Sequence, residues 1–207
     1  MRIETFLEDV RKNDVDISDY WEMDRYCAES KLEFASGASR LCVVFPKEKK
    51  VLKIPRHSMS IDYCAREMEN YKLAEKYGVE KILLPIEYYT TVNGTKVYIQ
   101  PLYSCAMCEM SSHEKKKLNN KISNLSGKEI VKKVQHGVFE SKWRTLDHRW
   151  TARVVQLYGK KFARSFEEWT QEAKVNDLHG YNIGWLDKKP IVLDYAGYYE
   201  NRESLPF

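Results

Sequence analysis

The sequence predicts an α+β fold in which an antiparallel β-sheet is followed by a mainly helical region. Apolar runs that flank polar turns occupy residues 32–101, which is the pattern of β-hairpins. After Pro101 the chain becomes mostly helical in pattern. A chain of 207 residues is long enough to bury a core in one large domain or in two small lobes.

The composition is that of a folded protein with a mild positive charge. The formal net charge of +4 is compatible with an anionic ligand such as a nucleotide and does not require nucleic acid. No apolar run approaches the roughly 20 residues that span a bilayer, and the N-terminus lacks the apolar core of a secretion signal. Five cysteines, an odd number, argue against a disulfide framework. We therefore expect a cytoplasmic protein with no membrane partner, in the host cytoplasm if the gene is viral.

Residues 1–31 are expected to form an N-terminal helical extension. One face of a helix over residues 3–12 would carry four apolar side chains, those of Ile3, Phe6, Leu7 and Val10. A second helix is expected after Asp16, which would serve as its N-cap. Both helices would pack on the segment that follows.

Residues 32–101 are expected to combine strands with one helix. Residues 41–45 and 51–54 flank a polar turn and predict a hairpin. A helix is expected over residues 61–77, with Gly78 ending it. A second hairpin is expected at Asn93-Gly94, because this dipeptide is a strong signal for a tight turn between strands. Its strands would cover residues 82–91 and 95–100.

Residues 102–207 are expected to be mainly helical. Helices are expected within residues 113–134, 140–157 and 160–173. Two short strands should follow, around residues 183–185 and 191–193.

Three polar residues near the C-terminus form the most informative pattern in the chain. Asp177 is followed five residues later by Asn182, and the apolar run 191–193 ends at Asp194. In phosphoryl transfer from ATP, one carboxylate orients or receives the attacking hydroxyl, while an amide oxygen and a second carboxylate hold Mg²⁺. The pattern therefore predicts chemistry that uses ATP and Mg²⁺.

This pattern resembles the catalytic loop and the metal-binding DFG motif of the protein-kinase superfamily. With His179 two residues after Asp177, it is closest in style to the atypical and aminoglycoside-phosphotransferase-like kinases. Two departures stand out: Val175-Asn176 precedes Asp177, and Tyr195-Ala196-Gly197 stands where the family has Phe-Gly.

The resemblance implies a two-lobed protein-kinase-like fold. Residues 32–101 would form an N-lobe with an antiparallel sheet and one helix, and residues 102–207 a small, mainly helical C-lobe that carries the catalytic and metal-binding loops. Ten residues follow Gly197, so the resemblance implies a truncated C-lobe.

The resemblance also assigns roles to residues of the first lobe. Lys53, in Val51-Leu52-Lys53-Ile54, would contact the α- and β-phosphates of ATP. Glu67 on the following helix would hold that lysine, with Glu69 as the competing candidate. In the second lobe, Asp177 would be the catalytic carboxylate, and Asn182 and Asp194 the Mg²⁺ ligands.

Two further segments would contact the nucleotide. The phosphate-covering loop corresponds to residues 35–40, where Gly37 is the only glycine and the hydroxyls of Ser36 and Ser39, or the side chain of Arg40, could contact phosphate. The hinge between the lobes corresponds to Gln100-Pro101-Leu102-Tyr103, where the backbone at Gln100 and Leu102 would hydrogen-bond adenine.

Three functions are compatible with these residues. The first is a phosphotransferase that moves the γ-phosphate of ATP to a hydroxyl of a protein or a small molecule. The second is a pseudokinase that binds nucleotide or a protein partner without catalysis. The third is a basic adaptor in which the lysines of residues 115–133 bind nucleic acid, which we regard as the weakest. Cys105-Ala106-Met107-Cys108 has too few nearby ligands for a zinc site and is interpreted as two unrelated cysteines.

Overall fold

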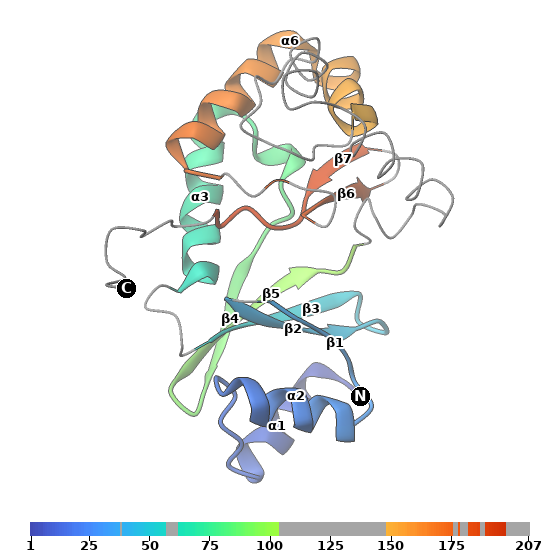
Figure 1. Ribbon diagram of the computed structural model, residues 1–207, viewed down its shortest axis with the longest axis vertical. Coiled ribbons are helices and arrows are strands. Elements are labelled where there is room, and N and C mark those ends of the chain that lie inside the picture. Colours follow the sequence, from blue (N-terminus) through green and yellow to red (C-terminus); the bar gives the residue numbers. More distant parts are fainter. Residues whose placement is uncertain are drawn as a thin grey trace, which may run out of the picture. The chain divides into compact units, whose positions relative to one another are not determined.

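The computed structural model describes residues 1–37, 39–56, 62–103, 148–175, 178, 182–186 and 189–197 (Figure 1). The described chain is an α+β protein with an antiparallel sheet, as predicted. It divides into two compact units. The first, here called the sheet unit, contains residues 1–71 and 84–103. The second, the helical unit, contains residues 72–83 and 104–207.

The sheet unit is built on five strands. They are β1 (Glu33–Ser36), β2 (Arg40–Phe45), β3 (Lys50–Pro55), β4 (Glu87–Val92) and β5 (Thr95–Pro101). Their order across the sheet is β1-β2-β3-β5-β4, every neighbouring pair is antiparallel, and β3 is central. The predicted turn between β4 and β5 is confirmed. Asn93 and Gly94 both have positive φ, 48° and 82°, as the two central residues of a type I′ hairpin turn require.

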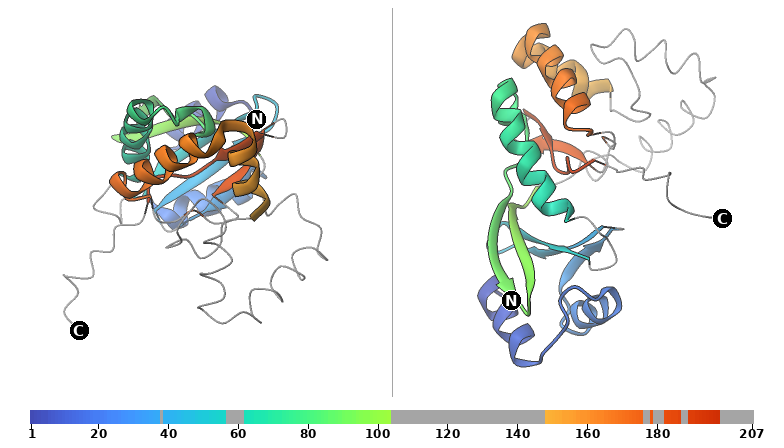
Figure 2. Two further views of the ribbon diagram at one scale, coloured as in Figure 1. Left: turned by 90° about the horizontal axis from the view of Figure 1, so that it is seen from above. Right: turned by 90° about the vertical axis from the view of Figure 1, so that its left-hand side faces the viewer.

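Two N-terminal helices cover one face of this sheet (Figure 2). The four apolar residues predicted on α1 (Ile3–Lys12) are all buried, and they join Leu41, Val43 and Phe45 of β2 in one core. The rings of Phe6 and Phe45 lie 5.6 Å apart. α2 (Tyr20–Glu29) adds Met23 and Cys27 to the same core. The helices of residues 1–31 and the sheet therefore share a hydrophobic core.

The predicted N-cap of the second helix is wrong by three residues. α2 begins at Tyr20, and the side chain of Asp19 accepts the Glu22 N–H at 2.8 Å. Asp16 instead accepts the N–H and the hydroxyl of Ser18, at 3.0 and 2.6 Å, which forms a local turn ahead of the helix.

The start of the fourth strand also differs from the prediction. Residues 82–86 do not belong to β4, which begins at Glu87. Glu80–Ile82 form a short 3₁₀ helix, η1, and Leu83 makes an isolated bridge to Val192. Pro85 has no N–H to donate to a neighbouring strand, which opposes an earlier start of the strand.

The helix α3 (Tyr63–Tyr77) has well-defined signals at both ends. The side chain of Asp62 accepts the N–H groups of Cys64 and Ala65, both at 2.9 Å, which caps the first turn. Gly78 has a φ of 67° and ends the helix, as predicted, because its N–H and that of Val79 bond back to the carbonyls of Glu75 and Ala74.

The helical unit contains α6 (His148–Glu172) and a two-stranded hairpin of β6 (Ile183–Leu186) and β7 (Lys189–Val192). Gly159 has non-helical angles, φ 82° and ψ 168°, so α6 consists of two helical stretches, as the sequence predicted. Trp169 is fully buried between Phe166 and Tyr195, with ring distances of 5.4 and 6.3 Å. The predicted helix within residues 113–134 lies outside the described residues. None of the helices described is both long enough and apolar enough to cross a bilayer.

The shared core of the N-terminal helices and the sheet predicts a large effect of one substitution. Phe6→Ala should lower the free energy of unfolding by about 3–5 kcal/mol, because it removes a fully buried ring and leaves a cavity. Trp21→Ala on α2 is the control, since Trp21 is 78% exposed and its loss should cost about 1 kcal/mol at most. Urea unfolding of both variants measures the difference. Equal effects would show that these helices do not share the core of the sheet.

Candidate functional site

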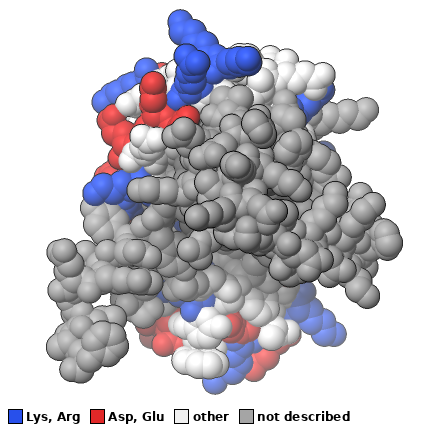
Figure 3. All heavy atoms as spheres, turned by 45° about the horizontal axis from the view of Figure 1, so that its top comes forward, with Lys and Arg blue, Asp and Glu red and all other residues white. Residues whose placement is uncertain are grey.

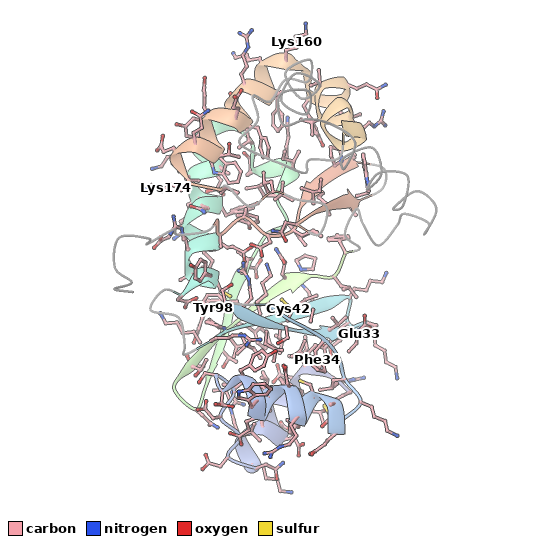
Figure 4. The ribbon with its side chains drawn as sticks, viewed as in Figure 1. Glu33, Phe34, Cys42, Tyr98, Lys160 and Lys174 are labelled. Atoms are coloured by element: carbon pink, nitrogen blue, oxygen red, sulfur yellow. The ribbon has the colours of Figure 1, made fainter. Side chains whose placement is uncertain are left out.

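One face of the sheet is apolar and the other carries charged side chains. Because successive residues of a strand point to opposite faces, the burial of Leu41, Val43 and Phe45 against α1 directs Arg40 and Cys42 to the other face. Cys42 is paired in register with Lys53 of β3, and Lys53 is paired with Tyr98 of β5. Figure 4 labels Cys42 and Tyr98 on this polar face.

A buried cluster of three charged residues lies on the polar face. Lys53 Nζ lies 2.9 and 3.1 Å from the two carboxylate oxygens of Glu67, which comes from α3. Arg40 Nη1 contacts Glu67 Oε2 at 3.0 Å. The exposed fractions are 0% for Glu67, 4% for Lys53 and 7% for Arg40. Of the two carboxylates proposed to hold Lys53, Glu67 makes the contact and Glu69 is exposed.

The start of α3 is attached to the same face by a second polar contact. The Tyr98 hydroxyl donates to Asp62 Oδ2 at 2.5 Å, and the other oxygen of Asp62 caps α3. Burial, together with this hydrogen bond, raises the pKa of Tyr98, and burial raises the pKa of the Cys64 thiol. Both groups therefore remain neutral at pH 7. In the Arg40–Glu67–Lys53 cluster, two cations share the carboxylate of Glu67.

The turn between β1 and β2 is tied to its surroundings. The Gly37 N–H donates to the Arg40 carbonyl at 2.9 Å, and the Arg56 N–H donates to the Ser39 carbonyl at 3.2 Å. The Ser36 hydroxyl donates to Asp24 of α2 at 3.1 Å and also contacts the Arg56 guanidinium. Ala38 lies outside the described residues. This turn, which contains the expected phosphate-binding residues Gly37 and Ser39, is thus anchored on α2 and on the end of β3.

The expected hinge residues are already engaged within the sheet unit. The side-chain amide of Gln100 is buried and donates to the Leu84 carbonyl at 3.0 Å. The backbone N–H of Leu102 donates to the Lys49 carbonyl at 2.9 Å. The Leu102 N–H is therefore not available to a nucleotide base. In a trans peptide the carbonyl and the N–H that follows it point in opposite directions, so the Pro101 carbonyl points away from β3 while the Leu102 N–H points toward it. The register of β4 begins at Glu87 opposite Ile99, so β4 does not extend to cover this edge.

In the helical unit, Asn182 and Asp194 are brought together by the β6–β7 hairpin. Asn182 directly precedes β6 and Asp194 lies two residues after β7, and the strands pair Ile183 with Val192. The Asn182 carbonyl accepts the N–H groups of Leu193 and Asp194, at 2.8 and 3.4 Å. Asp194 Oδ1 also accepts the Ala196 N–H at 3.3 Å. Two residues twelve positions apart in sequence are thus neighbours.

The glycine after Asp194 is required by close backbone packing. Gly197 has a φ of 75°, and a Cβ atom at this position would lie 2.2 Å from the carbonyl oxygen of Lys174. The chain after Asp194 therefore passes directly against Lys174, a residue labelled in Figure 4, three positions before Asp177 in the sequence. This contact explains why glycine stands at position 197. Asp177 itself, the expected catalytic carboxylate, lies outside the described residues, as does His179.

The donors at the hairpin suit a hard cation. An amide oxygen and a carboxylate are ligands that Mg²⁺ accepts, and in nucleotide sites Mg²⁺ takes one or two carboxylates together with phosphate oxygens and water. Within the described parts of the chain, no three His, Cys, Asp or Glu side chains gather as a complete metal cage.

Charged side chains of both signs are visible on the described part of the surface. On the face in Figure 3, Lys and Arg side chains are interspersed with Asp and Glu among the described residues. The lysines at positions 115–133, proposed as an alternative contact for nucleic acid, lie outside the described residues, and so do Cys105 and Cys108.

The chain matches no protein-family model and no curated protein. The contact of Arg40 with Glu67 is not among the expectations from the sequence, which assigns Arg40 only a possible contact with phosphate. The position of Arg40 two residues before Cys42, opposite Lys53, could have indicated that both cations share a face.

Substitutions of the charged residues in the Arg40–Glu67–Lys53 cluster should lower the free energy of unfolding by different amounts. Glu67→Gln should lower the free energy of unfolding by about 3–5 kcal/mol, because Arg40 and Lys53 then lose the carboxylate they share in a buried site. Lys53→Met should cost clearly less, since the Arg40–Glu67 contact remains. Glu69→Gln on the exposed side of α3 is the matched control and should change stability by about 0.5 kcal/mol at most.

Urea unfolding of the three variants measures these effects. A Glu67→Gln protein as stable as the Glu69→Gln protein would contradict the buried position of Glu67.

Proposed function

We propose that this chain is an ATP- and Mg²⁺-dependent phosphotransferase with a two-lobed, protein-kinase-like fold. The observation that carries the proposal is the buried contact between Lys53 on the central strand β3 and Glu67 on α3. A lysine ammonium fixed by a carboxylate is the arrangement that kinases use to hold ATP phosphates. The order of sheet, helix and later Asn182 and Asp194 in the sequence agrees with the resemblance.

In this proposal, the sheet unit binds the nucleotide. Lys53 would contact the α- and β-phosphates, and the turn with Gly37 and Ser39 would cover them. The adenine would donate a hydrogen bond to the Pro101 carbonyl and accept one from the Tyr103 N–H, because the Leu102 N–H already donates to the Lys49 carbonyl. The cationic side chains of Arg40 and Lys53 would attract an anionic ligand to this face.

The helical unit would supply the metal ligands and the catalytic carboxylate. Asn182 and Asp194 would bind Mg²⁺, which when bound spreads the charge that develops on the phosphates. Asp177 would orient the acceptor hydroxyl and take its proton. The acceptor oxygen then forms a bond to the γ-phosphorus as the bond to the β–γ bridging oxygen breaks, which yields ADP and a phosphate ester.

A pseudokinase that binds nucleotide without transfer is the second candidate. The observation that favours it is the β1–β2 turn, which has one glycine and is held by Arg56 and Asp24, whereas kinases use a mobile glycine-rich loop. The two candidates share the nucleotide site and differ in turnover alone. Hydrolysis or transfer of the γ-phosphate therefore distinguishes them once binding is established.

Nucleotide binding predicts a shift in the melting temperature. At about 100 times its dissociation constant, ATP that binds only the folded state should stabilise it by about 2.7 kcal/mol. The shift should require Mg²⁺ for its full size and should shrink in Asp194→Asn, which removes a charged ligand. Asp14→Asn, the same charge change at an exposed site before α2, should keep the full shift. Absence of any ATP-dependent shift in the wild type would contradict the proposal.

A further inference from the structure

We infer that Arg40 is a positioning residue of the proposed nucleotide site, which holds Glu67 in place while Lys53 binds the phosphates. The inference rests on the proposed function, because it assigns Lys53 to an anionic ligand. It goes beyond the Lys–Glu pair by adding a second cation, from a different strand, to the same carboxylate.

The geometry brings three elements together at one carboxylate. Arg40 comes from the start of β2, Lys53 from β3 and Glu67 from α3. Glu67 Oε2 accepts from both cations, at 3.0 Å from Arg40 Nη1 and 2.9 Å from Lys53 Nζ, whereas Oε1 contacts Lys53 at 3.1 Å. All three side chains are more than nine-tenths buried. Water therefore screens these charges little, and each contact depends strongly on the others.

Arg40 supplies a contact that does not depend on the ligand. When the Lys53 ammonium donates a hydrogen bond to a phosphate, its hydrogen bonding to Glu67 is weakened. A buried carboxylate that loses a cation is strongly unfavourable, so without Arg40 this step would be opposed. The guanidinium is permanently charged and stays on Oε2. Glu67 then remains fixed in position, and it can keep orienting the Lys53 ammonium.

Arg40 also connects this cluster to the turn between β1 and β2. Its backbone carbonyl accepts the Gly37 N–H at 2.9 Å and closes the turn, while its side chain holds Glu67. The residue that ends the proposed phosphate-covering turn is therefore the one that fixes the partner of Lys53. Displacement of the turn would move Arg40 and, through it, Glu67.

A double-mutant cycle tests this role. The dissociation constant of ATP with Mg²⁺ is measured by calorimetry for the wild type, Arg40→Met, Lys53→Met and the double variant. Arg40→Met should weaken ATP binding by about tenfold or more, the equivalent of one lost charge-assisted hydrogen bond. In the Lys53→Met background the same change should have an effect of less than about twofold, because Arg40 acts through Lys53. Arg40→Lys, which keeps the charge, should restore part of the affinity.

The outcomes separate the inference from the proposed function. Absence of ATP binding by the wild type would overturn both. ATP binding by the wild type with equal effects of Arg40→Met in both backgrounds, or with no effect, would overturn the role of Arg40 alone. Arg25→Met on the exposed side of α2 is the control for loss of an arginine and should leave ATP binding unchanged. If Arg40→Met fails to fold, Arg40→Gln, which removes the charge but keeps a polar side chain, runs the same cycle, and an unchanged affinity there contradicts the inference.

Discussion

The buried carboxylate of Glu67 is the interaction on which the rest of the sheet unit depends. It is fully buried, yet it is satisfied by two cations from two adjacent strands, so it fixes how α3 docks on the polar face of the sheet. A charge in such a place is costly unless it is paired, and pairing it demands that Arg40, Lys53 and α3 all be in register. The contact between Tyr98 and Asp62 attaches the first turn of α3 to the same face. The charged cluster therefore specifies how α3 docks on the sheet, and in the proposed function it would also orient Lys53 for an anion.

The two faces of the sheet differ in the side chains that they bury. The N-terminal helices cover the apolar face and bury Phe6 against Phe45, so the apolar side chains of that face are shielded from water by the chain itself. The opposite face keeps its charged residues together. α2 also contacts the segment that follows β3, because the Arg56 guanidinium lies 3.6 Å from the centre of the Tyr20 ring while the Arg56 N–H donates to Ser39 in the β1–β2 turn. The N-terminal helices thus stabilise the core and restrain the turn expected to cover phosphate.

Local signals in the sequence predicted much of this fold. Asn93-Gly94 and Gly78 act through backbone conformations that few residues adopt, so they located a hairpin and a helix end. Features that depend on packing between distant elements could not be predicted from the sequence. Asp16 and Asp19 are both good caps, and only the packing of α2 selects Asp19. The contact of Arg40 with Glu67 depends on the register of β2 and on the docking of α3. The direction of the Leu102 N–H depends on its hydrogen bond to Lys49, just before β3. The roles of Asp177, Asn182 and Asp194 stay predictions.

The central claim is that Lys53 lies at the phosphates of a bound nucleotide, and affinity labelling tests it most directly. An acyl phosphate of ATP places an activated carbonyl beside any lysine that contacts the phosphates. The lysine amine attacks that carbon, an amide forms, the bond to the phosphate oxygen breaks and ATP leaves. Mass spectrometry should find the acyl group on Lys53, with loss of the label in the presence of excess ATP and Mg²⁺. Labelling confined to exposed lysines such as Lys160, unchanged by ATP, would contradict the account.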